Sequence, residues 1–416
     1  MSSTKALNFW SLSDVGRERD HNEDSLLIDE DLGLFICADG MGGHAAGEVA
    51  SSMASRTIRD VLAAEATVLR DYAEGSERTS RIEVLRLLES SVQRACTTVY
   101  EQGVLDETKR GMGTTVDALL IVANRGFIAH VGDSRIYLHR QGSTHQLTED
   151  HSLINELLKR GRLTRAQIEK IHYKNAVTRA VGVYENVEVD VFDFDVLAGD
   201  SFLLCSDGLS GYLQDGELST LFEDCAHEDL ARHLIDLANS RGGRDNITAI
   251  VVHIPVVETG IDRLAREVHL KIELLHQMPL FRLLNYQELV RVLNSTSVCT
   301  FDAGASIVRE GEEGDALFIV LEGEVRVHAG ETTIANFGSG QHFGEMALLD
   351  KSSRSASVTS RTDSKLLCIR RAAFFDLVRN HHDLAVKLLW SFLGVLSQRL
   401  RLTSKELQEI KQQFSV

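Results

Sequence analysis

Apolar and polar positions along the first part of the chain form blocks of strands and blocks of helices. Residues 8–40 predict two short strands around a polar turn, and apolar positions that recur near a period of 3.6 predict helices over 44–102. Strands return over 114–150, with a hairpin signal at 124–126, and again over 187–256, where a helix interrupts them. These blocks do not alternate as βαβ units. We therefore expect an α+β fold in which an antiparallel β-sandwich is flanked by helices.

The remainder of the chain has a different pattern. Residues 258–295 and 372–412 predict helices, whereas 297–370 holds short strands at spacings of about 8–12 residues with Gly-rich turns. Such spacing is typical of a small β-barrel or jelly roll, here with flanking helices. The expected divisions are a first domain, a helical linker, a second domain and a helical C-terminal tail, at residues 1–254, 255–274, 275–400 and 401–416.

Charge separates the same two parts. The 416 residues hold 44 Lys and Arg against 61 Asp and Glu, a net charge of −17. Residues 1–254 carry 41 acidic and 25 basic residues, or −16, whereas residues 255–416 carry 20 and 19, or −1. Nucleic-acid binding needs a basic face, so this balance argues against that role.

Nothing in the sequence directs the chain into or across a membrane. It shows no secretory signal and no uncharged apolar run near the roughly 18–20 residues that a membrane span needs. Six cysteines are scattered without a CxxC pair, which is typical of reduced thiols rather than of a disulfide framework. We therefore expect a cytoplasmic protein that binds neither nucleic acid nor membrane.

Five carboxylates stand beside glycines or at the ends of apolar runs: Asp24, Asp39, Asp133, Asp207 and Asp245. Three of them follow the runs LFICAD, FIAHVGD and FLLCSD, and a carboxylate at the end of a core strand is costly unless it is paired or bound to metal. A single Asp-Gly is most often a turn. Five in this pattern instead favour hard oxygen ligands for Mg²⁺ or Mn²⁺. Two such ions about 3.5–4 Å apart can activate a water for attack on phosphorus.

The motifs around these carboxylates occur in a fixed order. They are SDVGRERDHNEDS, ADGMGGHAAGE, GMGTT, VGDSRIY, LTEDH, NAVTRAVG, SDGL and DNIT. In this order they closely resemble the bacterial metal-dependent protein phosphatases of the type 2C (PPM) family, over about residues 8–254. The resemblance implies a β-sandwich with a metal cleft at one end. It also implies hydrolysis of phosphoserine and phosphothreonine in proteins by a water that two metals activate, without a phosphoenzyme.

The resemblance implies which residues hold the two catalytic metals. Asp39, Asp207 and Asp245 would hold the first ion. Asp39 and the carbonyl of Gly40 would hold the second ion, with Asp24 near it, largely through water. The ions would be Mg²⁺ or Mn²⁺.

Further roles follow from the same resemblance. Asp133 would help to bind the third metal described in bacterial members, and Arg19 would bind the phosphate, with a surface salt bridge among RERDHNED as its alternative. His44 would transfer a proton to the leaving alkoxide, or would merely order the loop at a helix start. Residues 150–180 match the flap beside the cleft. Three residues are expected to fix this flap to the core: Asn175, Thr178 and Arg179.

The second domain contains a compact anion-site pattern. The run HFGEMALLDKSSRSASV combines backbone N–H groups after a glycine, one carboxylate, and an arginine nine residues later. It resembles the phosphate-binding cassette of cyclic nucleotide-binding domains, and the match covers about residues 275–400. The resemblance implies that Arg354 takes the phosphate and that Glu345 accepts from a sugar hydroxyl. The implied binding residues are Gly344, Glu345, Met346, Ala347, Arg354 and Ser355.

The residue after Arg354 bears on the choice of nucleotide. That position is often Ala or Thr in the family, and the Ser355 hydroxyl can serve the phosphate or a guanine, so cAMP is favoured over cGMP. The alternative is a degenerate cassette that binds nothing and serves docking or dimerisation. Four side chains are candidates to cap the base, although core packing is the stronger expectation for them: Phe374, Phe375, Leu389 and Trp390.

The sequence therefore predicts a protein serine/threonine phosphatase regulated by a cyclic nucleotide bound to its C-terminal domain. Its substrates would be phosphorylated proteins, the targets of a Ser/Thr kinase, and its C-terminal helices could pair two copies as a homodimer. Two alternatives stay open. One is a cyclic-nucleotide receptor with a catalytically silent phosphatase fold, and the other is a phosphatase whose second domain only dimerises or docks.

Overall fold

The computed structural model describes residues 7–42, 46–159, 176–256, 262–349 and 353–413. The chain divides into two compact units, Met1–Asp262 and Arg263–Val416, each with its own sheets and helices. Within the described residues, no helix is long and apolar enough to span a membrane.

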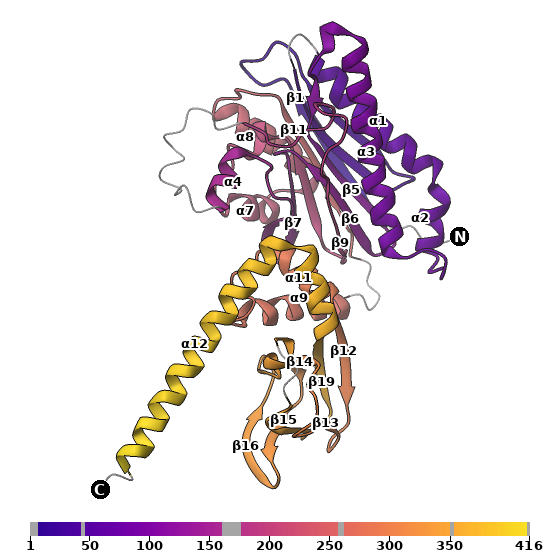
Figure 1. Cartoon of the computed structure of the whole chain (residues 1–416). Helices are drawn as coiled ribbons and strands as arrows, with labels where there is room; N and C mark the ends of the chain where they lie inside the picture. The colour runs from indigo at the N-terminus through magenta and orange to yellow at the C-terminus, as the bar shows by residue number, and fades with distance from the viewer. Residues whose placement is uncertain (1–6, 43–45, 160–175, 257–261, 350–352, 414–416) are drawn as a thin grey trace. The chain divides into compact units, whose positions relative to one another are not determined.

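The first unit is a sandwich of two antiparallel sheets (Figure 1). The five-stranded sheet has the order β1 (Asn8–Asp14), β11 (Ile247–His253), β10 (Ser201–Cys205), β7 (Arg135–Arg140) and β8 (Ser143–Gln146). The six-stranded sheet has the order β2 (Asp24–Asp29), β3 (Leu34–Met41), β5 (Val116–Val122), β6 (Arg125–Val131) and β9 (Asp190–Asp195), with β4 (Gly113–Thr114) paired to β3. Every pairing among these strands is antiparallel, which confirms the expected fold class.

Helices cover the outer faces of both sheets (Figure 1). On the six-stranded sheet lie α1 (Ala46–Ala64), α2 (Ala66–Ala73) and α3 (Arg81–Leu105). On the five-stranded sheet lie α7 (Glu217–Asp224) and α8 (His227–Ser240). Short helical turns occupy connections between strands: η1 (Glu107–Lys109), α4 (Leu153–Lys159) and α6 (Asp207–Ser210).

Both faces of the six-stranded sheet are buried, because successive side chains of a strand point to opposite faces. On β3, Leu34 and Ile36 belong to the core that the sheet forms with α1 and α3. Phe35, between them, meets Phe9 of β1 with ring centroids 5.7 Å apart. This contact joins the two sheets into one sandwich, so the continuous apolar run before Asp39 reads as a strand buried on both sides.

Two turns differ from the expectation from sequence. Residues 8–40, expected to hold two strands, hold β1, β2 and most of β3, because Asp29 Oδ1 accepts the Leu32 N–H at 3.1 Å and closes a turn between β2 and β3. The hairpin between β5 and β6 turns through Ala123, at φ 55°, one residue before the signal at 124–126. A left-handed alanine is uncommon, so composition could not indicate it.

The second unit contains two four-stranded antiparallel sheets, which confirms the expected β-barrel or jelly roll with flanking helices. One sheet has the order β12 (Thr296–Phe301), β19 (Ser364–Arg370), β14 (Ala316–Glu322) and β17 (His342–Phe343). The other has the order β13 (Ser306–Val308), β18 (Ser357–Ser360), β15 (Val325–Ala329) and β16 (Thr332–Phe337). The helices are α9 (Asp262–Gln277), α10 (Tyr286–Asn294), α11 (Arg371–Asn380) and α12 (His382–Gln413).

The expected helical tail is the last part of α12, a single helix of 32 residues. One stripe of α12 packs on the unit through Leu384, Leu388 and Phe392, which are buried. Leu389 and Trp390 are exposed, at 59% and 66%, so the core packing expected for them is wrong. A helix presents only one stripe to a neighbouring core, and these two residues follow the buried Leu388 on the side away from it.

Candidate functional site

Four strand ends bring carboxylates to one site in the first unit. Asp39 lies near the end of β3, Asp133 in the turn after β6, Asp207 at the start of α6, and Asp245 shortly before β11. Together they line a cleft with a volume of about 370 Å³. The other described residues on its wall are Arg19, Glu23, Gly40, Met41, Gly42, Thr115 and Val177.

The backbone around Asp39 is held on both sides. The Asp39 N–H donates to Thr115 Oγ1 at 2.9 Å, and Thr114 Oγ1 donates to the Asp39 carbonyl at 2.9 Å. Gly40 follows, and a Cβ at this position would overlap the Gly47 carbonyl oxygen of α1. Only glycine allows α1 to approach β3 this closely, so the packing fixes the position of the Gly40 carbonyl.

Asp24 faces Asp39 across the β2–β3 pair but is not among the residues that line the cleft. Its Oδ2 accepts hydrogen bonds from Thr248 Oγ1 at 2.6 Å and from Ser206 Oγ at 2.8 Å. Its Oδ1 is buried without a hydrogen-bond partner among the described residues. Burial raises the pKa of Asp24 to about 7, although the two hydrogen bonds oppose the shift. The buried oxygen is therefore a donor atom that a cation could satisfy.

Burial and mutual repulsion raise the pKa of the carboxyl groups in the cleft. The pKa of Asp133 rises to about 7, chiefly through burial and then through the charge of Asp207. The pKa of Asp39 lies far above its usual range and that of Asp207 is also raised, again through burial first and neighbouring carboxylates second. Each ionised carboxylate makes the next one costlier to ionise, so the cleft favours a compensating positive charge.

Arg19 supplies positive charge at the edge of this cleft. Its Nη2 lies 2.7 Å from Asp245 Oδ2, and its side chain is about half exposed. The alternative expected from sequence was a salt bridge to an acidic residue within RERDHNED. Arg19 instead pairs with Asp245, which is distant in sequence. A planar guanidinium at the cleft edge suits a phosphate, to which it can donate two parallel hydrogen bonds.

The donor atoms fit a divalent cation of the Mg²⁺ or Mn²⁺ kind. Carboxylate oxygens and a backbone carbonyl are hard ligands, and the buried Oδ1 of Asp24 has no other partner among the described residues. Within the part of the chain that the structure describes, no three His, Cys, Asp or Glu side chains are already arranged to hold an ion. The Arg19–Asp245 pair occupies an oxygen that a cation would need, Oδ2 of Asp245.

Glu23 and Thr115 line the cleft although the sequence analysis did not single them out. The Glu23 carbonyl accepts the Gly40 N–H at 3.2 Å, and burial raises the pKa of the Glu23 carboxyl even though Arg19 opposes the shift. Thr115 Oγ1 lies 2.7 Å from Ser134 Oγ. Both residues belong to motifs that carried the family resemblance, RDHNED and GMGTT, and that was the available signal.

Two expected residues, His44 and Asn175, lie outside the described residues. Thr178 and Arg179 lie where the segment 150–180 returns to the sandwich. Arg179 Nη1 donates to Asp190 Oδ1 at 2.9 Å, and the Thr178 N–H donates to a backbone carbonyl at the entry of the same segment. Arg179 thus joins this segment to β9, as expected, whereas the Thr178 bond joins the two ends of the segment to each other.

In the second unit, Arg354 is half buried beside β14. Its Nη2 donates to the Ala316 carbonyl at 2.9 Å, and its guanidinium carbon lies 6.0 Å from the centre of the Phe318 ring. Among the described residues, no carboxylate forms an ion pair with it. Burial lowers the pKa of Arg354, and the nearby Asp315 opposes this shift. A half-buried guanidinium that no carboxylate of the described residues neutralises is suited to bind an anion.

Gly344 packs directly against the Arg354 guanidinium, since a Cβ on this glycine would overlap Nη1. It precedes the helical turn η2 (Glu345–Leu348). The structure therefore brings the glycine and the arginine of the expected cassette together. Of the other expected binding residues, Glu345 and Ala347 are buried, whereas Met346 and Ser355 are exposed.

Two protein-family models match the chain, one over each of the two sites. The family model described as "Protein phosphatase 2C" matches residues 16–250, which is more than half of the chain. The family model described as "Cyclic nucleotide-binding domain" matches residues 298–381. Each match contains the site found in the corresponding unit.

Known proteins resemble the first unit. The serine/threonine phosphatase stp of Listeria welshimeri is 38% identical over 254 residues, which cover 60% of this chain and 97% of the relative. The crystal structure of the Mycobacterium tuberculosis serine/threonine phosphatase PstP/Ppp matches with 33% identity and a TM-score of 0.52, over 60% of this chain and 99% of the other. The catalytic domain of PstP in complex with two manganese ions matches with 34% identity and a TM-score of 0.50, over 60% and 99%. The chain therefore belongs to the protein phosphatase 2C family, as a metal-dependent protein serine/threonine phosphatase with a C-terminal cyclic nucleotide-binding domain.

Proposed function

We propose that the phosphatase reaction takes place in the acidic cleft, with two or three divalent cations, Mg²⁺ or Mn²⁺. In this proposal Asp39, Asp207 and Asp245 hold the first ion. Asp39 and the Gly40 carbonyl hold the second, close to Asp24. The convergence of buried carboxylates from separate strand ends is the observation that carries the proposal.

The remaining side chains of the cleft serve the third ion and the substrate. We assign Asp133 to the third ion, because it lines the same cleft from the turn after β6. Bound divalent cations lower the pKa of water and neutralise charge on phosphoryl oxygens. Arg19 binds the phosphate of a phosphoprotein, a target of a Ser/Thr kinase, through its two terminal nitrogens. His44 keeps its expected role as proton donor to the leaving hydroxyl group.

The test of this site is Mn²⁺-dependent hydrolysis of a phosphothreonine peptide by Asp39→Ala and Asp207→Ala. Each change removes a carboxylate that we assign to the first ion, so we expect hydrolysis to be abolished. Asp215→Ala, an exposed acidic residue outside the cleft lining, is the matched control and should hydrolyse the peptide as the unmodified chain does. Retained activity in both cleft variants would overturn the assignment. Absence of turnover in the unmodified chain would favour a silent phosphatase fold.

We further propose that the second unit binds a cyclic nucleotide, with cAMP favoured over cGMP. Arg354 takes the cyclic phosphate and Glu345 accepts from the ribose hydroxyl. Support comes from the half-buried guanidinium without an ion-pair partner among the described residues, packed against Gly344. Ser355, exposed beside Arg354, can add its hydroxyl to the phosphate.

Titration calorimetry tests this binding directly. We expect heat on addition of cAMP to the full chain, and binding about 10- to 100-fold weaker for Arg354→Ala, since a hydrogen bond to a charged group contributes about 1.5–3 kcal/mol. Arg361→Ala is the matched control, because Arg361 is exposed in a surface pair with Glu324. No heat with cAMP or cGMP would overturn the proposal and leave a docking or dimerisation module.

Regulation requires that the nucleotide change the phosphatase reaction. A ligand can do this only through different affinity for two states of the chain. We therefore expect kcat/KM toward a phosphopeptide to change on addition of cAMP to the full chain, and the change to disappear in Arg354→Ala. An unchanged kcat/KM at saturating cAMP would overturn the regulatory role while leaving the binding site in place.

A homodimer through α12 is favoured by one specific observation. Val386, Leu393 and Leu400 are exposed at intervals of seven residues, with Leu389 and Trp390 between the first two. Apolar residues repeated in this way form the seam of a coiled coil between two helices. We propose that a second copy of the chain covers this stripe.

Sedimentation of the full chain measures this association. We expect a dimer that dissociates in the double variant Trp390→Glu and Leu393→Glu, because two charges would be buried in the seam. Gln398→Glu, at an exposed position of the same helix, should leave the dimer intact. A monomeric unmodified chain would overturn the proposal.

A further inference from the structure

The turn that carries Asp133 is tied to both ends of the segment 150–180. The His151 N–H donates to the Gly132 carbonyl at 2.7 Å, and the His151 carbonyl accepts the Thr178 N–H at 2.7 Å. Val177, beside Thr178, lines the cleft together with Asp133. His151 therefore lies between the carboxylate turn and the chain that returns from the segment.

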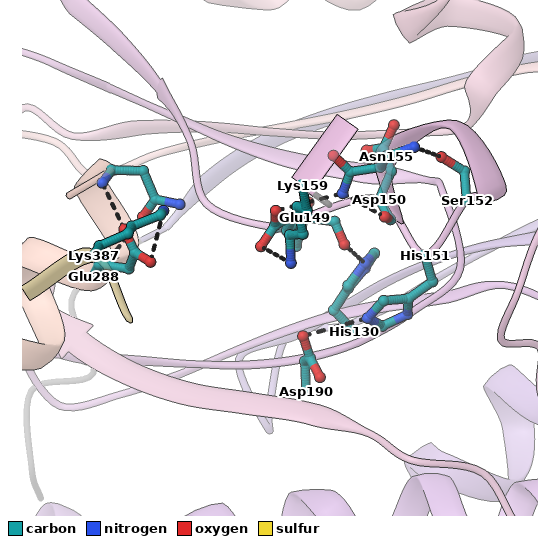
Figure 2. Close-up of polar contacts among 12 residues, drawn as sticks. His130, Glu149, Asp150, His151, Ser152, Asn155, Lys159, Asp190, Glu288 and Lys387 are labelled. Carbon is teal, nitrogen blue, oxygen red and sulfur yellow. Dashed lines mark hydrogen bonds and ion pairs between the residues drawn. The ribbon is translucent and has the colours of Figure 1, made fainter. Parts of the chain in front are cut away.

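Two imidazoles, those of His130 and His151, lie together at this junction between β6 and the entry of the segment (Figure 2). His130 of β6 lies 2.6 Å from Asp117 Oδ1 through Nδ1 and 3.0 Å from the Glu149 carbonyl through Nε2. His151, two residues after Glu149, accepts the Gly132 N–H on Nδ1 at 3.1 Å. The two rings lie 4.6 Å apart between centroids. His130 thus contacts the backbone two residues before His151, and His151 contacts the backbone two residues after His130.

The partners of the two rings require different protonation states. His130 faces oxygen acceptors at both nitrogens, so it is an imidazolium paired with Asp117. Burial alone would lower the pKa of His130, but the Asp117 carboxylate outweighs it and raises the pKa. His151 must be neutral to accept a hydrogen bond on Nδ1, and its Nε2 lies 3.3 Å from Asp190 Oδ2 and 3.1 Å from Nη1 of Arg179, which itself donates to Asp190. Burial, together with the nearby charge of His130, lowers the pKa of His151 in agreement with this state.

Gly132 is a position where the backbone needs this support. Its φ is +116°, and a Cβ there would overlap the Thr115 side chain, so the turn tolerates only glycine. Glycine is also the most flexible residue, because it has no side chain that could restrict its backbone. His151 binds both polar groups of Gly132, the N–H through Nδ1 and the carbonyl through its own N–H. Asp133 is the next residue.

We propose that His151 is a positioning residue that fixes the Asp133 turn for metal binding and couples it to both ends of the segment 150–180. The inference rests on the proposed role of Asp133 as a metal ligand. Groups that hold a metal ligand in place typically change metal affinity by about 10- to 100-fold when they are removed. His151 acts through Gly132 and Asp133 and does not touch the substrate.

Two substitutions separate the hydrogen-bond acceptor from the bulk of the side chain. In His151→Asn the amide oxygen occupies the place of Nδ1 and can still accept the Gly132 N–H, whereas in His151→Gln the amide reaches only the place of Nε2. In Mn²⁺ titration calorimetry of the full chain, we expect one Mn²⁺ site of His151→Gln to bind about 10- to 100-fold less tightly, the site that Asp133→Asn also weakens. His151→Asn should stay within a few-fold of the unmodified chain. Equal losses in the two variants would overturn the positioning role.

Amide hydrogen exchange without metal gives a second readout that does not depend on catalysis. We expect the Gly132 and Thr178 amides to exchange faster in His151→Gln than in His151→Asn or in the unmodified chain. Unchanged exchange of both amides in His151→Gln would overturn the proposal. His233→Gln, at an exposed position of α8, should change neither exchange nor Mn²⁺ binding.

Asp133→Asn distinguishes failure of this inference from failure of the metal assignment. If Asp133→Asn leaves all Mn²⁺ binding unchanged, the proposed role of Asp133 is wrong and the inference fails with it. If Asp133→Asn weakens one Mn²⁺ site while His151→Gln does not, the metal assignment stands and the positioning role is wrong. Weakening of the same site by both changes is the result we expect.

Discussion

Arg19 allows the role of one cleft residue in function to be separated from its role in stability. Arg19→Ala removes an ion pair with Asp245 at 2.7 Å, whose side chains are 47% and 30% exposed. An ion pair this open to solvent contributes about 0–1 kcal/mol to the free energy of unfolding. We therefore expect the melting temperature of the first unit to fall by less than about 4 °C.

The same substitution should reduce activity far more. Loss of one positioned donor to the charge of a transition state typically costs about 2.7–4 kcal/mol, or about 100- to 1,000-fold in rate. We expect a fall of this size in kcat/KM for a phosphothreonine peptide at saturating Mn²⁺. Arg19→Lys should recover only part of it, because an ammonium cannot donate two parallel hydrogen bonds to the phosphate. Hydrolysis and thermal unfolding are to be measured on the same samples.

Arg17 provides the matched control, since it is exposed two residues earlier and has no ion pair among the described residues. Arg17→Ala should leave both kcat/KM and the melting temperature unchanged. The reasoning is refuted if the two variants lose activity equally. It is also refuted if the loss in Arg19→Ala comes with a fall in melting temperature of more than about 10 °C, because a half-exposed pair cannot account for it.

Two further changes test the packing and the titration of the first unit. Gly40→Ala should lower the free energy of unfolding by about 1–3 kcal/mol in urea titrations, because its Cβ would overlap the Gly47 carbonyl, whereas Gly338→Ala, in open space, should not. Two buried histidines should also leave a pH signature in this unit: His227 and His253, both bonded to Ser201 Oγ, have pKa values lowered from 6.5 by burial. At these two sites the unfolded state binds more protons, so their contribution to stability is complete above about pH 6.5 and is lost as the pH falls through the folded pKa values, whereas the raised pKa values of the cleft carboxyls act in the opposite direction. Between pH 7.5 and 5.5 the urea midpoint of the unmodified chain should therefore fall relative to that of His253→Gln, and an unchanged difference between the two chains would contradict this.

The fold class could be predicted because hydrophobic burial leaves a periodic trace in the sequence. Asp39 and Asp207 each follow an apolar run that is buried on both faces of a sheet, so the sequence predicted their positions at strand ends. Antiparallel pairing then brings strand ends from distant parts of the chain to one edge. That the carboxylates meet in one cleft at one end of the sandwich was implied by the family resemblance and not by the periodicity.

Features that depend on contacts across the fold left no such trace. The bond between His151 and Gly132 joins residues 19 apart in sequence, and neither residue type is unusual for a loop. Ala123 adopts a left-handed conformation in the turn of a hairpin, where glycine or asparagine is the residue type that predicts such a turn. Leu389 and Trp390 were expected in the core because they are hydrophobic, but both are exposed. Hydrophobicity indicates that burial is favourable and does not indicate which surface buries the side chain.

The central claim is that the buried carboxylates of one cleft bind divalent cations. Mn²⁺ titration calorimetry of the full chain and of Asp39→Asn, which keeps the shape of the side chain and removes its charge, tests the claim most directly. We expect two or more Mn²⁺ ions to bind the unmodified chain and the tightest binding to be lost in the variant, with cAMP binding unchanged. Equal stoichiometry and affinity in the two chains would contradict it.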